Sequence, residues 1–79
     1  MHQPNIVRGI YRHYKGNHYQ VLDVVRHSET EEWLVLYKAL YNDFSLWVRP
    51  FDMFTENVVI DGVELARFEL IQPLEAIHG

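Results

Sequence analysis

The chain has 79 residues, of which 48% are hydrophobic, 14% aromatic and 23% charged, and it contains no cysteine. This length accommodates one small domain and excludes a two-domain enzyme, while the missing cysteines exclude a disulfide scaffold and a cysteine-ligated zinc site. The net charge is −4, but residues 1–27 carry +3 and residues 28–79 carry −7. The overall charge disfavours nucleic acid as a partner, and the basic first third is where an anionic partner is expected to bind.

The N-terminal residues do not resemble a secretory signal peptide, and no segment resembles a membrane span. Residues 1–8 lack an apolar leader segment, and the longest apolar run covers only residues 33–37, whereas a membrane span needs about 20 residues. We therefore expect a cytoplasmic protein with no membrane contact. A single domain is expected over residues 8–71, with flexible tails at residues 1–7 and 72–79.

The first half of the chain predicts two strands, over residues 9–14 and 18–27, joined by a tight turn that contains Gly16-Asn17. Gly and Asn both accept the positive φ that such turns require. A two-residue loop would place Tyr14 opposite Tyr19, and a three-residue loop would place Tyr14 opposite His18. The register therefore stays open at this point.

The third predicted strand, residues 32–40, is apolar on both faces, so we expect it at the centre of the sheet. Asn42 suits a left-handed backbone in the turn that follows. The fourth strand, residues 45–49, stops at Pro50, because proline cannot donate a hydrogen bond to a neighbouring strand.

The remaining part of the chain predicts one helical turn over residues 51–56, with Asp52 placed to cap it. A short strand over residues 58–60 is followed by Asp61-Gly62, a strong signal for a two-residue hairpin. The last strand is expected over residues 63–71.

These elements indicate a mainly β protein, a small SH3-type antiparallel barrel of five or six strands with one short helical turn. The largest apolar side chains are expected in its core: Trp33, Trp47, Phe54 and Phe68.

Four segments are distinctive in their order and spacing, namely residues 11–19, His27-Ser28-Glu29-Thr30, residues 36–41 and Leu46-Trp47-Val48-Arg49-Pro50. Together with Met53-Phe54 and Arg67-Phe68, they resemble a family of small bacterial proteins, domain-of-unknown-function family 1653. The resemblance implies an SH3-type barrel in a bacterial cytoplasmic protein, and it implies no activity. Asn42 stands where the family is expected to have glycine, a change that keeps left-handed geometry accessible.

The first hairpin mixes cations with flat aromatic rings, a combination suited to binding extended peptides or anionic groups. A barrel is expected to bring this hairpin, the turn at residues 27–30 and the region around Tyr37 and Arg49 to one end. The predicted binding residues are Arg12, His13, Tyr14, Lys15, His27, Glu29, Tyr37 and Arg49.

Each of these features also has a purely structural interpretation. Tyr14 and Tyr19 would then be a stabilising cross-strand pair. The Arg49 guanidinium suits a bidentate carboxylate or phosphate, but the favoured interpretation is an internal ion pair with Glu29 or Glu56.

No metal, cofactor or catalytic residue is predicted. His13, His18, His27 and Glu29 lack the spacing of a ligand motif, and His27, Ser28 and Glu29 are too close in sequence to form a triad.

The preferred function is a non-catalytic binding module for a peptide, a protein or another anionic partner. The first alternative is a small-ligand or enzymatic site around His13, His27, Glu29 and Arg49. The others are a weak nucleic-acid binder and a structural homodimer.

Overall fold

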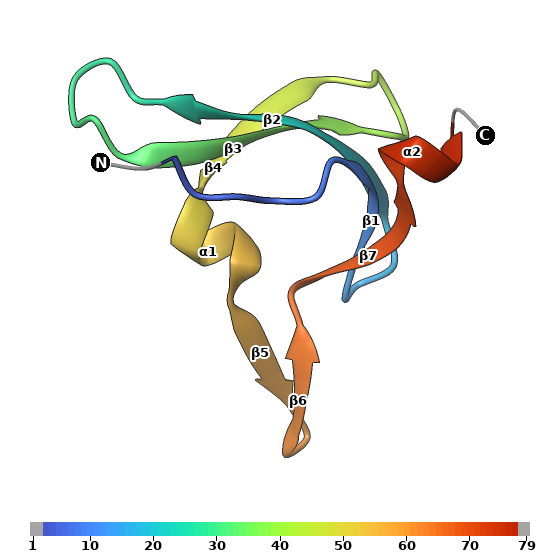
Figure 1. Ribbon diagram of the computed structural model, residues 1–79. Helices are drawn as coiled ribbons and strands as arrows, with labels where there is room; N and C mark the ends of the chain where they lie inside the picture. Colours follow the sequence, from blue (N-terminus) through green and yellow to red (C-terminus); the bar gives the residue numbers. More distant parts are fainter. Residues whose placement is uncertain (1–2, 78–79) are drawn as a thin grey trace.

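The computed structural model describes residues 3–77 and contains seven strands and two short helices (Figure 1). In chain order they are β1 (Gly9–His13), β2 (His18–Arg26), β3 (Trp33–Ala39), β4 (Leu46–Pro50), α1 (Phe51–Thr55), β5 (Asn57–Ile60), β6 (Val63–Ala66), β7 (Phe68–Pro73) and α2 (Leu74–Ile77). The prediction of a mainly β, antiparallel protein is confirmed. No helix within the described part of the chain is long and apolar enough to cross a membrane.

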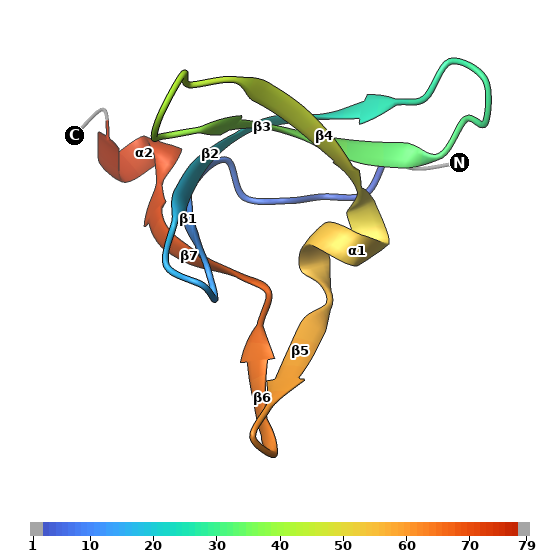
Figure 2. The same ribbon diagram turned by 180° about the vertical axis from the view of Figure 1, so that it is seen from behind.

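Five strands form one antiparallel sheet in the order β4-β3-β2-β1-β7, and β5 pairs only with β6 in a second, two-stranded sheet. The large sheet curves strongly, and α1 lies on its inner side (Figures 1 and 2). Within residues 3–77, β4 and β7 are edge strands that do not pair with each other. The predicted barrel is therefore not closed, because the chain between these two strands leaves the sheet and builds the β5–β6 hairpin.

The β1–β2 hairpin has a longer loop than the sequence suggested. Tyr11 pairs with Tyr19 and Arg12 with His18, while the His13 amide donates to the Asn17 carbonyl at 2.8 Å. Tyr14 consequently lies in the loop and faces neither of its expected partners, so the Tyr14–Tyr19 pair is wrong. The local signal at Gly16-Asn17 predicted the turn but could not fix its length.

The expected Asp61-Gly62 hairpin is confirmed, because Ile60 pairs directly with Val63. Both turn residues have positive φ, 50° at Asp61 and 78° at Gly62, as a primed turn requires. Asn42 also adopts the predicted left-handed conformation, with φ of 54°.

The final predicted strand, residues 63–71, is interrupted at Arg67. Before this residue the chain pairs with β5, and after it the chain pairs with β1. The Arg67 amide donates to the Glu56 carbonyl and its own carbonyl accepts from the Tyr14 amide. A change of partner strand requires a bend that apolar periodicity alone does not reveal.

The inner face of the sheet carries the core. Val21, Val35 and Phe54 are almost completely buried, together with Tyr11, Tyr37 and Phe68. β3 lies between β2 and β4 and has buried residues on both faces, as predicted. Trp33 is only partly buried.

Two local expectations around β4 and α1 are corrected. Trp47 remains 56% exposed because β4 is an edge strand with no neighbour beyond it. Pro50 precedes α1 in an extended conformation, and no side chain caps this helix, so Asp52 lies in the first turn without the expected capping role.

Candidate functional site

The strand register brings polar and aromatic side chains from five strands to one region of the inner face. His13 is paired with Phe68, Tyr37 with Trp47, and Val35, a core residue, with Arg49. Residues directly opposite each other in a sheet share a face. We call the resulting group the Arg49 cluster: His13, Tyr19, Tyr37, Tyr41, Arg49 and Phe68.

Phe68 is the central ring of the Arg49 cluster. Its centroid lies 4.9 Å from the His13 ring, 5.6 Å from the Tyr19 ring and 5.9 Å from the Tyr37 ring. Phe54 of α1 stacks on it at 4.0 Å with an interplanar angle of 6°. Because these rings restrain one another from several strands, they form a rigid aromatic surround for any group bound there.

Two hydroxyl groups of the Arg49 cluster are bonded to each other. The Tyr19 and Tyr41 oxygens are 2.8 Å apart. Burial raises the pKa of Tyr19 to about 12, and the hydrogen bond with Tyr41 contributes to the same shift. The Tyr19 phenol therefore remains protonated near neutral pH, and the pair can donate a hydrogen bond to an acceptor.

Arg49 is the charged member of the cluster, and it has no polar partner among residues 3–77. The partly buried side chain places its guanidinium carbon 5.7 Å from the Phe68 ring centroid. Its Nε is buried and makes no hydrogen bond. The predicted ion pair with Glu29 or Glu56 is wrong, because no ion pair to Arg49 forms in the described residues and Glu56 binds Arg67 at 2.7 Å.

The electrostatic environment of His13 is positive. Its pKa is lowered from the ordinary value, first by burial and then by the charges of Arg49, Arg67 and Lys15. The Arg67 charge is balanced by Glu56, whereas Arg49 has no such counter-charge. An anion bound beside Arg49 would therefore offset the effect of the Arg49 charge on the pKa of His13.

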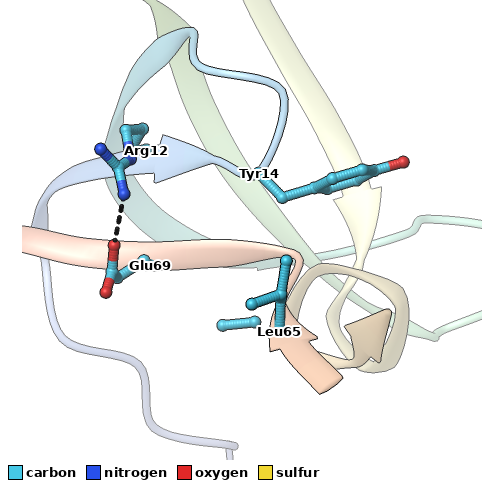
Figure 3. A pocket seen from close by; sticks show the side chains of 5 residues that line it. Arg12, Tyr14, Leu65 and Glu69 are labelled. Atoms are coloured by element: carbon cyan, nitrogen blue, oxygen red, sulfur yellow. Dashed lines mark hydrogen bonds and ion pairs between the residues drawn. The ribbon is translucent and has the colours of Figure 1, made fainter. Parts of the chain in front are cut away.

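Several predicted site residues lie outside the cluster. Arg12 pairs with His18 away from the inner face and forms an exposed ion pair with Glu69 at 3.0 Å. Figure 3 shows this pair beside Tyr14 and Leu65, which line a cleft of about 180 Å³ next to the β5–β6 hairpin. Lys15 lies in the same loop as Tyr14, with its ammonium nitrogen 5.8 Å from the Tyr14 ring centroid.

His27 and Glu29 belong to the turn at the opposite end of β2 from the first hairpin, so the expectation that one end of the fold gathers all three segments is wrong. The His27 Nδ1 accepts hydrogen bonds from the amides of Glu29 and Thr30, which gives this histidine a turn-forming role. The set His13, His27, Glu29 and Arg49 is therefore not assembled. No group of three metal-ligating side chains occurs within residues 3–77.

Four features of this region were not predicted from the sequence. Tyr19, Tyr41 and Phe68 were not predicted as site residues, and Trp47 was expected in the core although it is exposed. Tyr19 and Tyr41 are 22 residues apart, and Trp47 reaches the inner face only through its register with Tyr37. The many aromatic residues in the sequence indicated an aromatic site. The pairing of strands that are distant in the sequence decides which of these rings are in contact.

Comparison with known proteins places this geometry in a family. Residues 9–70 match the family described as protein of unknown function (DUF1653). A crystal structure of a DUF1653 protein from Bordetella bronchiseptica is similar, with 32% sequence identity and a TM-score of 0.80, covering 89% of this chain and 92% of that one. No curated protein matches the chain. The family match covers most of the 79 residues and the structural likeness agrees with it, so this chain belongs to the DUF1653 family.

Proposed function

We propose that the protein is a non-catalytic binding module that holds a carboxylate of a peptide or protein partner in the Arg49 cluster. The observation that carries this proposal is the unpartnered Arg49 guanidinium, whose Nε is buried on the inner face of the sheet. A buried donor without a partner is costly. A ligand carboxylate that accepts from Arg49 would remove that cost and gain a charge-assisted hydrogen bond.

The surroundings of Arg49 favour a peptide over a polyanion. Aromatic rings of Tyr19, Tyr37 and Phe68 suit the apolar side chains next to a carboxylate, and the Tyr19–Tyr41 hydroxyl pair offers a second donor. Only one uncompensated cation is present in the cluster, and the net charge of −4 opposes binding to nucleic acid. Aromatic surfaces on SH3-type domains bind extended peptides, and this proposal assigns the curved sheet a comparable use. The lack of cysteine fits a partner in a reducing compartment such as the bacterial cytoplasm.

The test uses matched peptides and matched variants. Short peptides with an aromatic residue next to a terminal carboxylate, and the same peptides ending in a carboxamide, are added to ¹⁵N-labelled protein. Carboxylate peptides are expected to shift the Arg49 Nε and Trp47 indole signals, and carboxamide peptides are not. Arg49→Gln is expected to weaken binding at least tenfold, because a hydrogen bond to a charged group contributes roughly 1.5–3 kcal/mol.

Arg8→Gln is the control, because it removes an equal charge from an exposed arginine outside the cluster. If both variants weakened peptide binding equally, the effect would come from the general loss of a positive charge, and this result would contradict the proposal. A single-stranded oligonucleotide that shifts the same signals when no peptide does would also contradict it.

A further inference from the structure

The β5–β6 hairpin, residues 57–66, forms an arm that extends away from the rest of the domain (Figures 1 and 2). Its register pairs Val58 with Leu65 and Ile60 with Val63. Because side chains alternate between the faces of a strand, these four residues share one face. The opposite face carries Asn57, Val59, Glu64 and Ala66. The arm is thus amphipathic, with one face that is entirely apolar.

The apolar face of the arm is left uncovered by the rest of the chain. Three of its four side chains are exposed, Ile60 by 40%, Val63 by 57% and Leu65 by 41%, and Val58 is partly buried. Each strand has only four residues and pairs with no strand outside the arm. A two-stranded hairpin of this kind is marginally stable in water unless another element packs on its apolar face. A cover on the apolar face would therefore stabilise the arm, and residues 3–77 do not supply one.

The accessible surface and the radius of gyration are both larger than expected for a compact monomer, which agrees with a surface that a partner covers. The accessible surface is 5671 Å², about 600 Å² more than the surface expected for a compact monomer of 9.5 kDa. The radius of gyration is 13.1 Å, against about 11.6 Å for a compact domain of this length. A standard interface buries about 800 Å² on each partner, so the excess is comparable to one interface.

The tip and the base of the arm are complementary. The tip carries Asp61, with Glu64 nearby, and no basic residue occurs between residues 57 and 66. The base adjoins the cleft that Arg12, Tyr14 and Leu65 line, where a basic and an aromatic side chain lie beside the apolar face (Figure 3). Glu69 also lines this cleft and accepts one hydrogen bond from Arg12, so Arg12 retains N–H donors for a second carboxylate. An apolar side chain with a neighbouring carboxylate fits such a cleft, and the arm tip has that composition.

We propose that the cover is a second copy of this chain, with the two arms packed through their apolar faces in opposite directions. In this arrangement Ile60 and Val63 of each copy lie against Val58 and Leu65 of the other, and each Asp61 reaches the cleft beside Arg12. A two-fold axis makes both contacts occur twice, as in most homodimers. The proposal is independent of the Arg49 cluster, because the arm contributes no residue to that cluster.

The first test compares the two exposed valines of the arm by sedimentation equilibrium. The wild-type mass is expected to rise from 9.5 kDa toward twice that value as the concentration increases. Val63→Glu, on the apolar face, is expected to remain monomeric throughout. Val59→Glu is the matched control, because Val59 is 66% exposed on the opposite face of the same hairpin, and it should dimerise like the wild type.

The second test fixes the relative direction of the arms and uses the absence of cysteine from the chain. A double variant, Asp61→Cys with Leu65→Cys, places one thiol at the tip and one near the base, on the apolar face. These positions are three residue steps, or about 10 Å, apart along the arm, too far for a disulfide within a copy. Oxidation should therefore yield a covalent dimer, and Asp61→Cys alone should yield little.

A wild-type protein that stays at 9.5 kDa up to millimolar concentration would overturn the proposal, as would equal effects of the two valine variants. Efficient crosslinking by Asp61→Cys alone would show the tips together and overturn the head-to-base arrangement.

Discussion

Replacement of Arg49 by methionine is expected to make the protein more stable while it removes the proposed ligand contact. Methionine keeps most of the length of the side chain and fills irregular spaces well. It also removes the buried Nε donor that has no hydrogen-bond partner. A residue selected only for folding should not behave in this way, so the variant separates a structural from a functional role.

The magnitude follows from two opposing contributions. Loss of the unpartnered donor stabilises the fold by about 1–3 kcal/mol, and loss of the guanidinium contact with Phe68, whose distance is 5.7 Å, costs about 0.5–1 kcal/mol. The net gain is about 1 kcal/mol. For a domain of this size it corresponds to a rise in Tm of roughly 4–8 °C, or to about 1 M in the urea midpoint.

Thermal and urea unfolding followed by circular dichroism would measure the effect, with Arg8→Met as the control. The Arg8–Asp23 pair is exposed, at 55% and 48% for the two side chains, so its loss should change stability by less than about 1 kcal/mol. If Arg49→Met instead unfolds at a clearly lower temperature than the wild type, Arg49 stabilises the fold and our reasoning about the site is refuted.

Three further predictions concern the sheet and its charges. Phe68→Ala should destabilise the protein by about 3–5 kcal/mol in urea unfolding, because it empties the centre of the aromatic core. Gly9→Ala should destabilise far more than Gly16→Ala, since an added Cβ at Gly9 meets the backbone of β7 and at Gly16 meets nothing within 4 Å; similar urea midpoints would contradict this. The unfolding free energy should fall as the pH drops below 6.5, because the lowered pKa of His13 makes the unfolded chain bind its proton more tightly than the folded chain does. Arg49→Met should raise the pKa of His13 measured by NMR titration and reduce that loss of stability.

The sequence predicts the strands of this fold well where local chemistry decides the outcome. Asp61-Gly62 and Asn42 adopt the backbone conformations that their residue types favour, and the apolar β3 lies inside the sheet. Arg49 was recognisable as an unusual cation next to Trp47 and Pro50 for the same local reason. These features depend on a few neighbouring residues, which is the range over which sequence patterns are informative.

The features that were mispredicted depend on which strands become neighbours. Trp47 is exposed because β4 is an edge strand. Arg49 has no carboxylate partner within residues 3–77, because the bend at Arg67 brings that arginine, and not Arg49, to Glu56. Neither fact follows from apolar periodicity, since a single change of partner strand alters both. The position of His27 at the far end of β2 is likewise a property of the topology.

The bend at Arg67 connects the two regions for which we propose partners. Arg67 binds Glu56 through its Nε at 3.1 Å and its Nη2 at 2.7 Å, which closes the base of the arm, and the next residue, Phe68, is the centre of the Arg49 cluster. A domain of this length has only a small surplus of stability. An uncovered apolar face and an unpartnered buried donor both reduce that surplus. A ligand or a second copy that binds the folded chain would restore this stability. The two surfaces are therefore better explained as sites that a partner completes than as parts of a fold that acts alone.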